Sequence, residues 1–127
     1  MRAEIGKRVM NRVVETLIYR LKPGTGAEFD RIMRDVSVPL HRRAGMDVVA
    51  YANSLHDPDA YILVRAYDDP DHLRASQDAF YASADWRTGP RAAIIGMIST
   101  SLKVITEVPA DAVEALRQIV PVPSHLV

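Results

Sequence analysis

A strand that leads directly into a proline-initiated helix, within residues 61–75, is the feature that most constrains how this chain can fold. The run Ala60–Tyr67 is rich in β-branched and aromatic residues, which favour a strand. Asp69 and Pro70 follow, a pair typical of an N-cap residue and the first position of a helix. Because this strand is apolar on both faces, its sheet is predicted to be covered on both sides.

Three other segments show the two-residue alternation of side chains that is typical of a strand. The further predicted strands are Val13–Leu21, Met46–Ser54 and Thr100–Val108. The turn residues between Met46–Ser54 and Ala60–Tyr67 are His56-Asp57-Pro58-Asp59. They predict an antiparallel hairpin between these two strands.

Helical segments fill the remaining connections. Thr25 and Glu28 have capping-box spacing at the start of the first helix, and Pro39 predicts a kink or a break near Ser37. The helix that begins at Pro70 is expected to end by Ala84. After it we expect a bend at Asp85–Pro90, a short helix at Pro90–Ile98, and a final amphipathic helix at Ala110–Val120.

The predicted order is β-α-β-β-α-β, which is an α+β, ferredoxin-like fold with an antiparallel sheet. Two helices cover only one face of such a sheet, and the C-terminal helix is too short to cover all of the other. We therefore expect a homodimer that pairs sheets face to face as a dimeric α/β barrel. The expected organisation is a flexible arm at 1–12, the ferredoxin-like domain at 13–109, and a C-terminal helix and tail at 110–127.

Charge and composition argue against several classes of function. Lys plus Arg and Asp plus Glu are 16 each, so no overall field favours nucleic acid or an anionic membrane. There is no cysteine, and the four histidines lack metal-ligand spacing, so we expect no metal site and no cofactor. No window approaches the roughly 18 apolar residues of a membrane span, and a cytoplasmic location is expected.

Four motifs in order make the chain resemble the NIPSNAP family, within the larger dimeric α/β-barrel superfamily. They are Glu15–Gly24 (ETLIYRLKPG), Val38-Pro39-Leu40, Leu63–Asp69 (LVRAYDD) and Asp85-Trp86. Arg65 stands where the family often carries an aromatic residue. The resemblance implies a ferredoxin-like domain and a dimer, without an assigned activity. Superfamily relatives include cofactor-free monooxygenases, haem-degrading enzymes and lactone isomerases.

Five residues are candidates to line a ligand pocket: Tyr19, His41, Tyr51, Arg65 and Trp86. Arg65 lies in the middle of a buried strand, so it needs a partner. Glu15, Glu107, a carboxylate across the dimer or a bound anionic substrate each fit that need. His41 follows Pro39, where it suits either a general base or haem ligand in a pocket, or a helix end that interacts with the dipole.

Three functions remain open from the sequence. The first is a NIPSNAP-like dimer that binds a small molecule, without a recognisable catalytic set. The second is a cofactor-independent monooxygenase or isomerase acting on a small, aromatic molecule through Arg65, Tyr51, Tyr19 and His41. The third is a non-catalytic scaffold for protein interaction.

Overall fold

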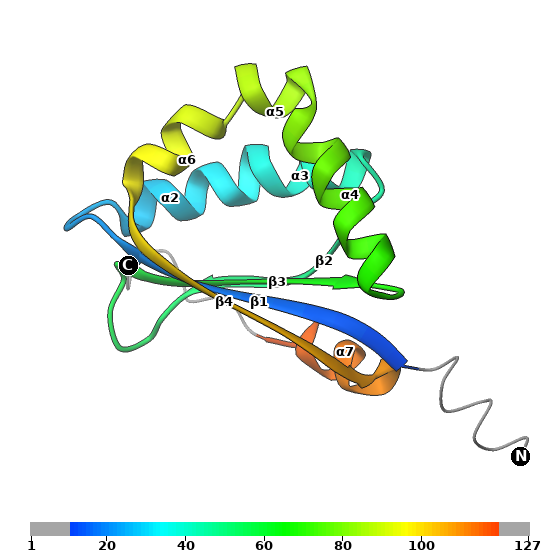
Figure 1. Ribbon diagram of the computed structural model, residues 1–127. Coiled ribbons are helices and arrows are strands. Elements are labelled where there is room, and N and C mark those ends of the chain that lie inside the picture. Colours follow the sequence, from blue (N-terminus) through cyan, green and yellow to red (C-terminus); the bar gives the residue numbers. More distant parts are fainter. Residues whose placement is uncertain (1–10, 120–127) are drawn as a thin grey trace, which may run out of the picture.

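A computed structural model describes residues 11–119 of the chain (Figure 1). Its elements are β1 (Asn11–Leu21), α2 (Gly26–Ile32), η1 (Met33–Ser37), α3 (Val38–Arg43), β2 (Asp47–Asn53), β3 (Ala60–Tyr67), α4 (Pro70–Ala82), α5 (Ala84–Thr88), α6 (Arg91–Met97), β4 (Ile98–Pro109) and α7 (Ala110–Leu116). Most of the predicted N-terminal arm and the predicted extended tail lie outside the described residues. Within them, the α+β, ferredoxin-like order is confirmed.

The four strands form one antiparallel sheet in the order β2-β3-β1-β4. The predicted hairpin of β2 and β3 is present, and β1 lies between β3 and β4. In this register Glu15 lies opposite Arg65 on one side and opposite Ile105 on the other. The two central strands therefore bring a carboxylate and a guanidinium together at the middle of the sheet.

Helices cover the two faces of the sheet unequally. Figure 1 shows α2 to α6 on one face and the short α7 alone on the other. The larger core cluster lies under α2 to α6, and a smaller one forms where Val113 of α7 packs on Val14, Val64 and their neighbours. The C-terminal helix covers part of the second face, as its length predicted, and Ile18, Leu102 and Val104 stay exposed there.

The first helix changes its winding rather than breaking at Pro39. Phe29, Ile32 and Met33 form its buried stripe, and Val36 is exposed. Residues Met33–Ser37 form a π-helical turn, in which the Val38 amide donates to the Met33 carbonyl. Pro39 has no amide hydrogen to donate, and the wider turn absorbs that loss without ending the helix. The expected kink near Ser37 is this turn.

The predicted capping box at Thr25 is wrong. The Thr25 hydroxyl donates to the Lys22 carbonyl (2.7 Å) and makes no capping bond. Instead the Asp59 carboxylate, on the β2–β3 turn, accepts from the amides of Gly24 and Gly26, each at 2.9 Å. A partner from another part of the chain therefore satisfies two amides at the start of the helix, in place of a local cap.

Local signals located the later elements well, with two corrections. The Asp69 side chain accepts from the His72 amide (2.7 Å), and Pro70 is the first residue of α4, as predicted. The short helix expected at 90–98 is α6. The bend expected at Asp85–Pro90 is wrong, because Ser83 caps a short helix there by accepting from the Trp86 amide (3.2 Å). The last helix ends at Leu116, earlier than expected.

Candidate functional site

A buried ion pair occupies the centre of the sheet on its helix-covered face. Arg65 and Glu15 are 1% and 0% exposed. The Arg65 Nε and Nη2 atoms both lie 2.7 Å from Glu15 Oε1. Glu15 was one of the predicted partners of Arg65, whereas Glu107 accepts from the Asn11 side chain instead (3.0 Å). The Arg65–Glu15 pair therefore forms within one chain.

The second Glu15 oxygen has its own partners. Gln77 Nε2 donates to Oε2 at 2.7 Å, and Lys103 Nζ lies 3.4 Å away. Burial alone raises the pKa of the Glu15 carboxyl, but the charge and hydrogen bonds of Arg65, with help from Gln77 and Lys103, lower it below its usual value. Glu15 is a buried carboxylate that stays ionised.

His41 is held in one protonation state by two contacts. Its Nδ1 lies 2.7 Å from the Ser37 carbonyl, which can only accept, so Nδ1 carries the hydrogen. Its Nε2 then accepts from Arg65 Nη1 at 3.0 Å. Burial, with the neighbouring Arg65 charge, lowers the pKa of His41 to about 4. His41 is therefore a neutral, buried acceptor. It lies at a helix end, in the last turn of α3, as one of its two interpretations held, but it carries no positive charge there to interact with the dipole.

Tyr81 joins this network to the surface. Arg65 Nη1 also donates to the Tyr81 hydroxyl at 2.7 Å, and the Tyr81 residue is 38% exposed. Tyr81 and Gln77 were not among the sequence candidates. They lie four residues apart on α4, a spacing that places both on one helix face, and that face follows Leu73 toward the sheet. This spacing is the signal that could have found them.

A recess opens beside Tyr81, between the sheet and the later helices. It has a volume of about 430 Å³ and is lined by Tyr19, Tyr81, Trp86, Arg91, Ile94, Ile95 and Ile98. The Tyr81 and Trp86 rings meet edge to face with their centroids 5.3 Å apart. Three aromatic side chains and three isoleucines thus surround a space of the size that small ligands occupy.

The five candidate residues fall into three groups. Tyr19 and Trp86 line the recess. Arg65 and His41 are bonded to each other and lie behind Tyr81. Tyr51 is half-buried, packs against the main core cluster, and is not among the residues that line the recess. The structure brings four of the five into one connected region.

A second hollow of about 430 Å³ lies between α3 and α4 and is lined in part by Leu40, Arg43 and Phe80. None of the residues bonded to Arg65 lines this hollow, whereas Tyr81 lines the recess, so the recess is the better candidate. Among residues 11–119, no group of three His, Asp or Glu is placed to hold a metal ion. No helix in the same range is both long and apolar enough to cross a membrane.

Similar structures define the fold. No family model matches the sequence, and no curated protein matches it. A NIPSNAP family protein with unknown function from Agrobacterium tumefaciens superposes with a TM-score of 0.71 and 18% identity, over 79% of this chain and 90% of the other. An uncharacterized NIPSNAP domain protein from Burkholderia xenovorans has a TM-score of 0.66 and 24% identity, over 77% and 94%. This chain has the NIPSNAP fold.

The NIPSNAP resemblance of the sequence is thereby confirmed at the level of the fold. Its motifs at Glu15–Gly24 and Leu63–Asp69 begin in the strands β1 and β3, which carry the Arg65–Glu15 pair, and end in the turns that follow. This chain is also similar in structure to a cofactor-independent oxygenase from Streptomyces nogalater. That protein has a TM-score of 0.56 and 16% identity, over 75% of this chain and 90% of its own.

Proposed function

We propose that this NIPSNAP-like protein is a homodimer that binds a small, partly aromatic molecule in the recess beside Tyr81. One observation carries the proposal: an aromatic recess is connected through the Tyr81 hydroxyl to the buried Arg65. Rigid aromatic walls supply apolar contact, and a single well-positioned polar group at one end gives orientation.

The state of His41 favours binding over histidine-based catalysis. Both ring nitrogens are engaged, one with Ser37 and one with Arg65, and the low pKa keeps the ring neutral. His41 therefore supports Arg65 rather than abstracting a proton from a ligand.

A cofactor-independent oxygenase is the second candidate. Its support is the shared fold with the Streptomyces nogalater oxygenase and the hydroxyls of Tyr19 and Tyr81 at an apolar recess. Oxygen consumption with an added aromatic substrate separates this candidate from binding alone. Failure of every small molecule to bind favours the third candidate, a protein-interaction scaffold.

The dimer part of the proposal rests on the sheet face that α7 leaves uncovered. Ile18 lies opposite Leu102 and Thr16 opposite Val104, so three large apolar side chains share one face. Ile18, Leu102 and Val104 are 47%, 60% and 47% exposed. They lie on or beside β4, which is paired on one side only. A second copy of the chain covers such a surface at the smallest cost, because it brings the same apolar face.

A thermal-shift screen against small aromatic and acidic metabolites tests the binding proposal. A ligand that binds only the native state raises the midpoint of unfolding. Ile95→Trp is expected to fill the recess and abolish the shift, because Ile95 lines the recess and is half exposed. The matched control is Ile119→Trp, at an exposed isoleucine that lies outside the recess lining. No stabilising compound, or equal loss in both variants, contradicts the proposal.

A further inference from the structure

The hydroxyls of two tyrosines at the recess have hydrogens that no group among residues 11–119 accepts. The Tyr81 oxygen accepts a hydrogen bond from Arg65 at 2.7 Å, so its own hydrogen is free to donate elsewhere. The Tyr19 hydroxyl has no hydrogen-bond partner among the described residues, and Tyr19 lines the same recess. Burial raises the pKa of Tyr19 above its ordinary value, so this hydroxyl stays protonated at neutral pH. Both groups are donors.

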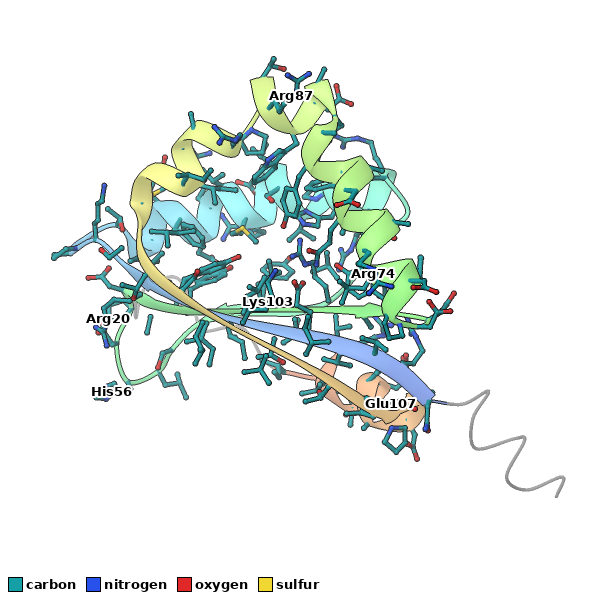
Figure 2. All side chains as sticks on the ribbon, in the orientation of Figure 1. Arg20, His56, Arg74, Arg87, Lys103 and Glu107 are labelled. Carbon is teal, nitrogen blue, oxygen red and sulfur yellow. The ribbon has the colours of Figure 1, made fainter. Side chains whose placement is uncertain are left out.

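The charges near these donors are predominantly positive. Arg65 and Lys103 bear two positive charges against the single negative charge of Glu15, and Arg91 lies at the recess as well. His41 adds none, because its two contacts and its low pKa keep it neutral. Figure 2 shows Lys103 on the side of the sheet that faces the helices. Half of the Lys103 side chain is exposed, so its ammonium group has hydrogens left after the contact with Glu15.

Positive charge near free hydroxyl donors recognises an anionic oxygen better than a neutral one. The Tyr81 and Trp86 rings and the three isoleucines recognise a planar apolar body. Glu15 does not compete for the site, since both of its oxygens are already bonded within the network.

We propose that the recess takes an aromatic carboxylate, with a carboxylate oxygen between the hydroxyls of Tyr19 and Tyr81 and the ring against Trp86. The inference deepens the proposed function and rests on it. Lys103 supplies long-range attraction, and Arg65 remains behind Tyr81 without touching the ligand.

Three probes of one shape and different charge test the ligand class: naphthoate, naphthylmethanol and naphthylmethylammonium, all of the same ring isomer. Calorimetry is expected to give naphthoate about tenfold tighter binding than the alcohol, and no measurable binding of the ammonium. Added salt is expected to weaken the binding of naphthoate and to leave that of the alcohol nearly unchanged.

Phenylalanine variants test the two donors. Tyr81→Phe and Tyr19→Phe are each expected to lower naphthoate affinity about tenfold while changing naphthylmethanol affinity little, because the ring remains. Tyr51→Phe, which removes a hydroxyl outside the recess, is the matched control and is expected to change neither. Lys103→Met is expected to lower the affinity for naphthoate and to leave that for naphthylmethanol unchanged. Its control is Lys22→Met, at an exposed position beside a turn.

The outcomes separate this inference from the function on which it rests. Equal affinity for naphthoate and naphthylmethanol overturns the carboxylate assignment and leaves the recess as a binding site. The same follows if the two phenylalanine variants weaken both probes alike. If none of the probes binds and the wider metabolite screen also finds no ligand, the proposed function fails together with the inference.

Discussion

At the scale of single residues, the chain keeps a charged pair in its core by giving each of its polar atoms a partner. Arg65 bonds to Glu15, His41 and Tyr81, and Glu15 bonds to Gln77 as well. Among the described residues, no buried polar side-chain atom is left without a partner. An ion pair in this setting costs desolvation free energy that hydrophobic packing would not, so stability alone is a weak reason for its presence. We interpret the pair as the support that holds Tyr81 at the recess.

His41 gives a pH-dependent prediction at this scale. Its pKa in the native state is about 4, below the ordinary value of 6.5, so between these values the unfolded chain binds a proton that the native chain does not. The free energy of unfolding should therefore fall as pH is lowered from about 6.5 toward about 4, by up to about 3 kcal/mol. Urea denaturation at a series of pH values in that window measures the slope.

Variants at two histidines show whether His41 is the source of this pH dependence. His41→Gln is expected to remove most of the slope, whatever its effect on stability at neutral pH. His56→Gln, at an exposed turn position, is expected to keep it. The pKa of Glu15 is lowered from its ordinary value of 4.5, so its own contribution is lost only as pH falls below about 4.5, which overlaps the His41 window at the acidic end alone. A slope that survives in His41→Gln assigns the dependence to another group.

At the scale of elements, the start of α2 depends on a turn that is distant in sequence. The Asp59 carboxylate accepts from two amides there, and a Cβ atom on Gly26 would lie 2.0 Å from the Pro58 carbonyl oxygen. Asp59→Ala is expected to lower the free energy of unfolding by about 1–2 kcal/mol, and Thr25→Ala by less than about 0.5 kcal/mol. Chemical denaturation of both variants measures the difference. A larger loss for Thr25→Ala would show that the threonine is the cap.

Elements whose signals are local were predictable from the sequence. Asp69 and Pro70 start α4 because the cap and the first turn involve only neighbouring residues. The cap of α2 was not predictable, since Asp59 and Gly26 come together only when the β2–β3 turn packs on the helix. Trp86 was expected in a bend, and a serine cap at Ser83 turned that segment into α5.

In the candidate site, too, some features were predictable from the sequence and others were not. A buried arginine on a strand signalled the need for a partner, and strand pairing made Glu15 one of few choices. The bonds from Arg65 to His41 and Tyr81 depend on how α3 and α4 pack over the sheet, which no local pattern encodes. Tyr51 has the same residue type as Tyr19, but it lies on the edge strand β2, outside the recess lining.

At the scale of the whole molecule, the uncovered sheet face predicts a dimer that a single charge should disrupt. Leu102→Arg and Ile18→Arg each place a charge in the proposed interface, where burial without a partner is costly. Light scattering is expected to give twice the chain mass for the native protein at micromolar concentration and the chain mass for these variants. Val36→Arg, at an exposed apolar residue of η1, is the matched control and should stay dimeric. A native protein with the chain mass contradicts the dimer.

The central claim is that the recess beside Tyr81 is the ligand site, and the single tryptophan of the chain makes a direct test possible. Trp86 lines the recess. Because it is the single tryptophan, its indole N–H gives one nitrogen–proton NMR signal that needs no assignment. Titration with the tightest ligand from the thermal-shift screen is expected to move that signal saturably, with the dissociation constant found by calorimetry. A ligand that binds by calorimetry and leaves the Trp86 signal in place would locate the site elsewhere and contradict the account.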